Sequence, residues 1–201
     1  MKHEVSRQKT IQKQQSQIKV GELIIGTRVP YEYFVVQGSG ESDLGYHPGA
    51  FDVALEKAGG IQDYNHVVYS SILPKDAVRI LAPPKTYDHG AVLESITAEA
   101  GKGKIFPRRL TAGIVITKVL KNGEFIGGLV AEYNGEGSKD ECKEFLKKNM
   151  SGMISRRYGI NGIITEDEFF IESIEPKSKY ACALVVLGFT SYKVPLLESA
   201  S

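Results

Sequence analysis

The sequence lacks the features that mark membrane-spanning and exported proteins. It has no uninterrupted apolar run long enough to cross a bilayer. Residues 1–19 are polar and rich in Gln and Lys, and they lack the apolar centre of a signal peptide. We therefore expect a cytoplasmic protein without a membrane partner.

The sequence also lacks an excess of charge of either sign. It contains 25 Lys and Arg against 24 Asp and Glu, so its formal net charge is +1. This balance gives no electrostatic reason to expect binding to nucleic acid or to an anionic surface. We expect no nucleic-acid partner.

Cysteine and histidine are scarce. Cys142 and Cys182 fall in different expected elements, and neither has a second Cys or His nearby at metal-ligand spacing. Both are typical of reduced, buried side chains, and we expect no metal site. His47, His66 and His89 have no defined partner in the sequence, so we assign them no acid–base role.

Apolar residues are numerous enough to fill a core. They make up 42% of the 201 positions, which is sufficient for one domain. We assign residues 20–201 to that domain and residues 1–19 to a flexible N-terminal tail. The tail is either dispensable or an arm that touches a neighbouring subunit.

The hydrophobic pattern predicts two helices. Apolar residues share one face over residues 51–58, and Gly59-Gly60 provides the stop. The second helix follows the capping box formed by Ser138 and Glu141, and it ends at Gly159. Gly38–Gly45 is expected to be a flexible loop, but it lacks the lysine and the following helix of a phosphate loop.

The remaining pattern predicts strands. They are expected at residues 21–25, 33–37, 67–69, 77–82, 90–98, 110–120, 124–133, 169–174 and 180–189. Asn122-Gly123 is a strong hairpin signal between two of them. The last strand is nearly continuous in apolar residues and is expected to be central. Together these elements predict an α+β sandwich with mostly antiparallel sheets.

A serine pair lies at the end of one predicted strand. Val67, Val68 and Tyr69 have strand composition, and Pro74 stops the strand soon after Ser70-Ser71. The serines are open to two interpretations. Their hydroxyl groups could cap local backbone groups. Alternatively, if the peptide bond after Ser70 is strained and dry, the Ser71 hydroxyl could attack the Ser70 carbonyl and cut the chain.

Three separated motifs, taken together, resemble one family. They are Gly49-Ala-Phe-Asp-Val-Ala-Leu-Glu-Lys-Ala-Gly, then Asn65 to Pro74, then Gly127-Gly-Leu-Val-Ala-Glu-Tyr. In this order they resemble the pyruvoyl-dependent arginine decarboxylases, over about Thr27 to Tyr192. The resemblance implies the layered fold of the pyruvoyl-dependent histidine/arginine decarboxylases, with helices covering two stacked sheets, and a homo-oligomer that is a trimer or a multiple of it.

The resemblance also implies a cofactor made from the chain itself. Cleavage between Ser70 and Ser71 would give a beta chain, residues 1–70, and an alpha chain, residues 71–201. Ser71 would become a covalent pyruvoyl group, an electrophile that replaces a bound aldehyde cofactor. The family match assigns Asn65 to the same site, where its amide would bind the attacked carbonyl or orient the substrate. Its local alternative is a residue that satisfies backbone groups at a strand start.

Two carboxylates complete the implied site. Glu132 stands among apolar neighbours, where burial would raise its pKa, and the family match makes it the acid that reprotonates the substrate. The alternative is a strand-end glutamate that faces water. Asp52 matches the family aspartate that takes a guanidinium group. Its alternative is an acid in the first turn of a helix.

The implied function is decarboxylation of L-arginine to agmatine and carbon dioxide. The substrate is thus a small basic amino acid, and ornithine or lysine stays open because Asp52 would accept any cationic side chain. A different class of protein also stays open. It is a paralogue that is not processed and acts as a partner subunit.

Overall fold

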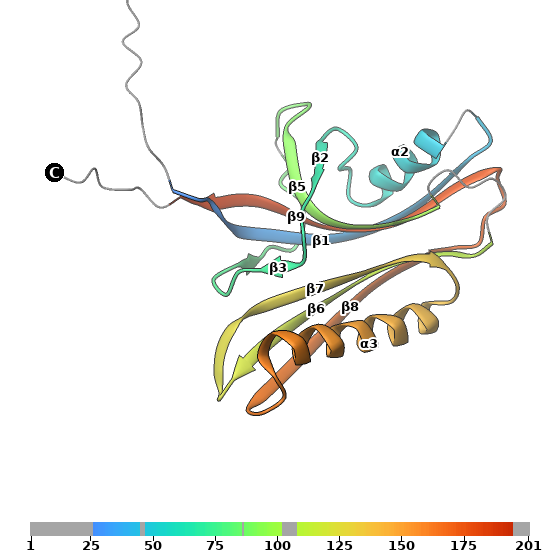
Figure 1. Ribbon diagram of the computed structural model, residues 1–201. Helices are drawn as coiled ribbons and strands as arrows, with labels where there is room; N and C mark the ends of the chain where they lie inside the picture. Colours follow the sequence, from blue (N-terminus) through green and yellow to red (C-terminus); the bar gives the residue numbers. More distant parts are fainter. Residues whose placement is uncertain (1–25, 45–46, 86, 102–107, 195–201) are drawn as a thin grey trace, which may run out of the picture. The chain divides into compact units, whose positions relative to one another are not determined.

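Residues 26–44, 47–85, 87–101 and 108–194 are described by the computed structural model of the chain. Residues 29–193 form one compact unit of two stacked β-sheets, with a helix on the outer face of each sheet (Figure 1). This arrangement confirms the predicted α+β class. The predicted tail, 1–19, and the predicted strand at 21–25 lie outside the described residues.

The first sheet has five strands, in the order β2-β5-β9-β1-β4. The strands are β1 (Val29–Ser42), β2 (Asn65–Val68), β4 (Val78–Arg79), β5 (Val92–Ala100) and β9 (Tyr180–Lys193). The long neighbours β5, β9 and β1 are antiparallel, whereas β2 and β4 add at the two edges as parallel strands. The apolar strand β9 lies at the centre, as predicted, and its residues from 180 to 189 are buried.

The second sheet has four antiparallel strands, in the order β3-β7-β6-β8. They are β3 (Ile72–Leu73), β6 (Leu110–Lys121), β7 (Glu124–Glu136) and β8 (Ile163–Ile174). The hairpin between β6 and β7 turns at Asn122 and Gly123, whose φ angles are 54° and 84°. Two successive positive φ angles fit a type I′ turn, which confirms the hairpin prediction.

Three apolar layers hold the unit together. The sheets bury one layer between them, with Ile114 from one sheet and Val185 from the other. Helix α2 (His47–Lys57) covers the first sheet, and helix α3 (Lys139–Tyr158) covers the second. Because side chains alternate along each strand, each sheet has apolar side chains on both faces. One face packs against the other sheet and the opposite face packs against a helix.

The predicted loop at Gly38–Gly45 is wrong over its first five residues. Residues from Gly38 to Ser42 continue β1 and pair with β9. The glycines serve close packing, because a Cβ atom at Gly40 would lie 2.4 Å from the Ala50 carbonyl oxygen in α2. Composition alone predicts a loop where several glycines stand close together. The predicted strand at 77–82 is also shorter, and only β4 forms there.

Helix α3 begins and ends where the sequence predicts. Its N-cap is Ser138, which forms the complete capping box with Glu141, and Gly159 follows its last residue. Cys142 and Cys182 are buried and free. Burial raises the pKa of the Cys142 thiol to about 11, so this thiol is unreactive near neutral pH.

Candidate functional site

The serine pair lies where the chain crosses from one sheet to the other (Figure 1). Strand β2 ends at Val68 in the five-stranded sheet, and β3 begins at Ile72 in the four-stranded sheet. The Tyr69 N–H donates to the Ser95 carbonyl oxygen of β5 at 2.6 Å. The Ser71 carbonyl oxygen accepts from the Val130 N–H of β7 at 3.0 Å. The crossing is therefore fixed at both ends.

The carbonyl of Ser70 is held within the crossing itself. It accepts the N–H of Ile72 at 3.2 Å, which closes a three-residue turn over Ser71. Ser70 is exposed and Ser71 is half-buried, so the single chain does not keep this peptide bond dry. Among the described residues outside glycine, only Asn122 has a positive φ, so the serines show no strain of that kind.

Glu132 lies on β7, two residues beyond the Val130 that binds Ser71. Val130 belongs to the apolar layer between the sheets, and Glu132 shares its face because side chains alternate along a strand. Glu132 is half-buried, and this burial raises the pKa of its carboxyl group. The alternative of a glutamate that faces water is therefore wrong.

Asp52 and Asn65 lie together in a different part of the unit. Both line an open hollow of about 570 Å³ between α2 and the β2 edge of the first sheet. Asp52 is exposed and follows the helix start at His47 by five residues. No acidic residue stands in the first turn of this helix, so the first-turn alternative for Asp52 is wrong.

Asn65 does not reach Ser70 within one chain. Its Nδ2 donates to the Gly90 carbonyl oxygen at 2.6 Å. Six residues of extended chain separate Asn65 from Ser71, which corresponds to a span of up to about 20 Å. The structure thus brings Ser71 near Glu132 and Asp52 near Asn65, as two separate groups.

The hollow has further lining residues that the sequence did not single out. Glu99 of β5 and Tyr64 both contribute to its wall, and Tyr64 stacks on Tyr87 with ring centroids 3.8 Å apart. Alternation along β5 places Glu99 on the α2 side of the sheet. The predicted strand ended at residue 98, whereas β5 continues to Ala100, so the alternation that places Glu99 appeared only with the structure.

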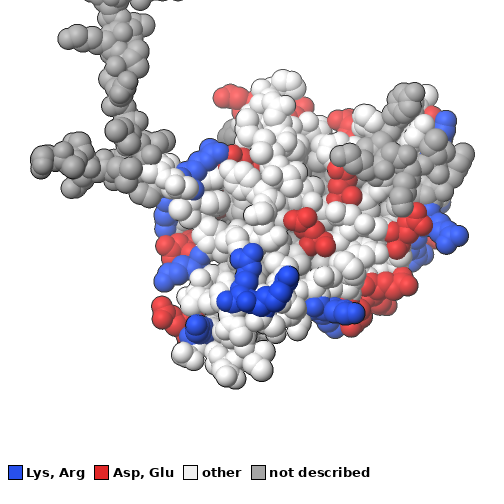
Figure 2. All heavy atoms as spheres, in the orientation of Figure 1, with Lys and Arg blue, Asp and Glu red and all other residues white. Residues whose placement is uncertain are grey.

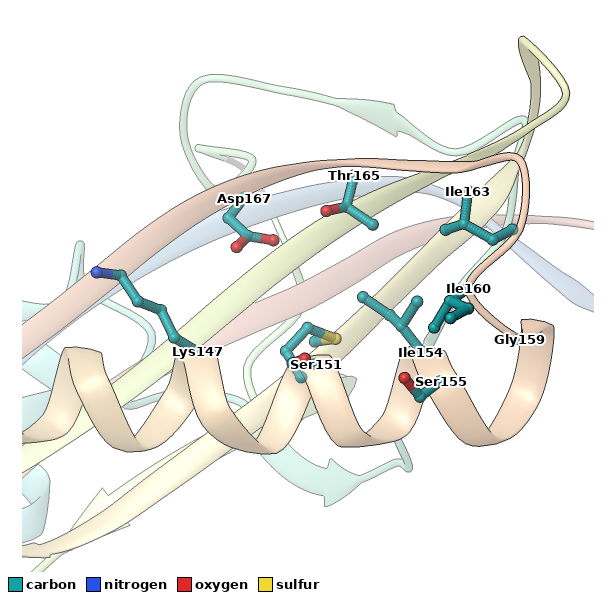
Figure 3. Close-up of a pocket in the computed structure, with 10 residues that line it drawn as sticks. Lys147, Ser151, Ile154, Ser155, Gly159, Ile160, Ile163, Thr165 and Asp167 are labelled. Carbon is teal, nitrogen blue, oxygen red and sulfur yellow. The ribbon is translucent and has the colours of Figure 1, made fainter.

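A second hollow, of about 230 Å³, lies between α3 and β8 (Figure 3). The two charged side chains that line it already have partners. Asp167 accepts a hydrogen bond from Thr117 at 2.6 Å, and Lys147 pairs with Glu144 at 2.7 Å. This hollow contains none of the predicted site residues.

The histidines and surface charges point to no other site. His66 contacts the Ile61 carbonyl oxygen at 3.0 Å, and the exposed His89 lies 3.6 Å from Asp63. The described residues contain no group of three His, Cys, Asp or Glu placed to hold a metal ion. Acidic and basic side chains are interspersed on the face that Figure 2 shows. In the described part of the chain, no helix is both long and apolar enough to span a membrane.

Fold and site together define a class of protein. It is a two-sheet α+β protein whose serine pair occupies the crossing between the sheets, beside a carboxyl group whose pKa burial raises. A sequence model of the pyruvoyl-dependent arginine decarboxylase family matches residues 32–194. The chain belongs to this family.

Individual relatives agree with the family match. The chain is 35% identical to the pyruvoyl-dependent arginine decarboxylase AaxB of Chlamydia abortus, over 84% of this chain and 94% of the relative. It is 35% identical to AaxB of Chlamydia pneumoniae, over 85% and 96%. Identity to AaxB of Chlamydia trachomatis serovar D is 34%, over 84% and 94%. The chain is thus a decarboxylase, a lyase that depends on a covalently bound pyruvoyl group.

Proposed function

We propose that the enzyme cleaves itself between Ser70 and Ser71 and then decarboxylates L-arginine to agmatine and carbon dioxide. One observation carries the proposal. Separate hydrogen bonds to the two sheets fix the serine crossing, at Tyr69 on one side and at Ser71 on the other. A chain that is cut there keeps both new ends in place, as a cofactor made from the chain requires.

The surroundings of residue 71 fit a pyruvoyl group. Cleavage keeps the carbonyl of residue 71, and that carbonyl accepts the Val130 N–H at 3.0 Å. When present, the group supplies a ketone for the substrate amine and a conjugated carbonyl that takes up the electrons released with carbon dioxide. A backbone donor on that carbonyl favours the negative charge that develops there.

Glu132 would provide the proton that completes the reaction. Loss of carbon dioxide leaves the α-carbon in need of a proton, and a carboxyl group can supply it only while protonated. Burial raises the pKa of Glu132 and therefore extends its protonated range toward neutral pH. Its position two residues from Val130 puts it on the strand that holds Ser71.

Asp52 would bind the distant end of the substrate. Its carboxylate is exposed at the edge of the hollow and can accept two parallel N–H donors from a guanidinium group. Ornithine or lysine would offer a single ammonium instead. The relatives are named arginine decarboxylases, which supports arginine over shorter basic amino acids.

A complete site would need more than one copy of the chain. Ser71 with Glu132, and Asp52 with Asn65, form two groups that one chain keeps apart. The edge beside the serine crossing is apolar and exposed, at Val68 (62%), Ile72 (45%) and Val92 (62%). We propose that a second copy covers this edge in a homo-oligomer, a trimer or a multiple of it, and so shields the Ser70–Ser71 bond from water.

We also propose that the fold is that of the pyruvoyl-dependent histidine/arginine decarboxylases, with residues 20–201 as its single domain. The four-layer order of helix, sheet, sheet and helix supports this assignment. Two free, buried cysteines support a reducing, cytoplasmic location.

Two measurements test the proposed function. Mass spectrometry of the purified protein should find residues 1–70 and 71–201 as separate chains, with pyruvoyl in place of Ser71. A single uncut chain would favour the partner-subunit alternative. With arginine, ornithine, lysine and histidine supplied together, agmatine should be the main product. Putrescine as the main product would show that the substrate is ornithine and not arginine.

A further inference from the structure

Glu94 is a buried charged residue without a role in the proposed decarboxylation. Its exposed fraction is 6%, and it is the only Asp, Glu, Lys or Arg among the buried residues of the described ranges. Burial of a carboxyl group costs free energy, so a buried carboxyl group points to a structural or chemical task. Its position indicates which task.

Glu94 faces the layer between the two sheets. On β5, Leu93 packs under α2 and Ile96 packs between the sheets. Because side chains alternate along a strand, Glu94 points to the same side as Ile96. Its pairing neighbours are Val67 on β2 and Phe189 on β9.

Glu94 also lies beside the serine crossing. Tyr69, the residue before Ser70, binds the Ser95 carbonyl oxygen, and its ring lies 6.1 Å from that of Phe189. Phe189 pairs directly with Glu94. Glu94 is therefore the residue before Ser95, which binds the crossing where the crossing leaves the first sheet.

Strands β5 and β7 of the two sheets are aligned with each other beside the serine crossing. The crossing joins Ser95 of β5 to Val130 of β7 through Tyr69 and Ser71. Four residues further along both strands, the Glu99 N–H donates to the Asn134 side chain at 2.9 Å. With this common spacing, Glu94 precedes the joined residues Ser95 and Val130 along the strands, and Glu132 follows them. Because side chains alternate along each strand, both glutamates point toward the opposite sheet.

Self-cleavage needs proton transfers that decarboxylation does not use. First, the Ser71 Oγ adds to the Ser70 carbonyl carbon, the peptide bond between that carbon and the Ser71 nitrogen breaks, and the hydroxyl proton passes to the nitrogen. This forms an ester. A base then removes the Ser71 α-proton, a Cα–Cβ double bond forms, and the Cβ–Oγ bond breaks, leaving the Ser70 carboxylate. Protonation of Cβ and exchange of nitrogen for water oxygen, with loss of ammonia, complete the ketone.

We infer that Glu94 is the base that takes the Ser71 α-proton in the elimination step. The inference rests on the proposed self-cleavage. It assigns two carboxyl groups that face the inter-sheet layer to two reactions, with Glu94 from the first sheet serving cleavage and Glu132 from the second serving substrate turnover. Paired carboxyl groups in unequal surroundings commonly divide roles in this way.

The test compares Glu94→Gln with Glu144→Gln, a matched change at an exposed site on α3. Freshly purified proteins are followed by denaturing gel and mass spectrometry, with and without hydroxylamine, which cuts esters. Glu94→Gln should slow the appearance of residues 71–201 by about 10²- to 10⁴-fold. It should also accumulate the ester, seen as hydroxylamine-dependent scission after residue 70. Glu144→Gln should cleave at the wild-type rate.

Three outcomes separate the inference from its alternatives. Wild-type cleavage in Glu94→Gln overturns it, as does slow cleavage without accumulated ester, which would assign Glu94 a purely structural role. Circular dichroism and thermal melting check the fold. If Glu94→Gln does not fold, Glu94→Asp decides the question, because a shorter carboxylate should slow elimination and still accumulate ester. Absence of cleavage in the wild type would instead refute the proposed function.

Discussion

Replacing Glu132 by Gln tests the proton that completes turnover. The two side chains have nearly the same shape, so the change removes the acidic proton and leaves the packing against the inter-sheet layer intact. General acid catalysis contributes about 10²- to 10⁴-fold to a rate. We therefore expect kcat to fall by about this factor, equivalent to about 3–5 kcal/mol of activation free energy.

The stability of the folded protein should also depend on Glu132, and the contribution of this residue should fall as the pH rises. Burial raises the pKa of Glu132 from its ordinary value of 4.5, so the folded protein holds this proton more tightly than the unfolded chain. The stability that the proton contributes is complete below the unfolded pKa and is lost as pH rises through the folded pKa. Because Gln has no such proton, the wild type should lose stability relative to Glu132→Gln as the pH rises from the unfolded pKa, near 4.5, through the raised folded pKa of Glu132.

The assay measures agmatine formation, self-cleavage and thermal melting on the same preparations. Glu132→Gln should be cut to completion, melt within a few degrees of the wild type near neutral pH, and bind arginine. Turnover within a few-fold of the wild type would remove Glu132 from the acid role. A variant that stays uncut would show that Glu132 serves cleavage instead.

Three further predictions concern other residues. Ser71→Ala should block both cleavage and decarboxylation while the protein stays folded, and a cut, active variant on a denaturing gel would refute the assignment. Asp52→Asn should raise the KM for arginine by about 10- to 100-fold with less effect on kcat, since a charged hydrogen-bond partner contributes about 1.5–3 kcal/mol. An unchanged KM in steady-state kinetics would place the guanidinium elsewhere. Gly40→Ala should lower the free energy of unfolding by about 1–3 kcal/mol in urea titration, because its Cβ would lie 2.4 Å from a backbone oxygen of α2. An unchanged urea midpoint for Gly40→Ala would contradict this packing.

Local signals in the sequence were sufficient for much of the fold. The Asn122-Gly123 hairpin and the capping box at Ser138 depend on residues only a few positions apart, and both formed as predicted. The error at Gly38–Ser42 has a different origin. Those glycines are required by contact with α2, a tertiary contact that composition does not reveal.

The sequence predicted the surroundings of one candidate residue, Glu132, but not how the candidate residues are grouped. The apolar neighbours of Glu132 in the sequence correctly predicted that the residue is partly buried and that its pKa is raised. The separation of Asn65 from Ser71 depends on β2 being extended and pairing with β5. The position of Glu94 depends on the register between β5, β2 and β9 and on the alignment of two sheets. Neither fact follows from spacing along the chain.

The place of the serine pair explains how the fold can survive a cut. The piece before the cut contains β1, α2 and β2, and it is held by pairing of β1 with β9 and of β2 with β5. It also shares an apolar core with the second piece, in which Phe34 and Ala54 pack with Leu184 and Val186. Dissociation would expose this core, so the two pieces should stay together after cleavage. A cut inside a strand would break ladder hydrogen bonds, whereas a cut between two sheets breaks none that these strands need. The crossing is thus a position where a new terminus can form without loss of strand pairing, while the bonds to Ser95 and Val130 keep it in place.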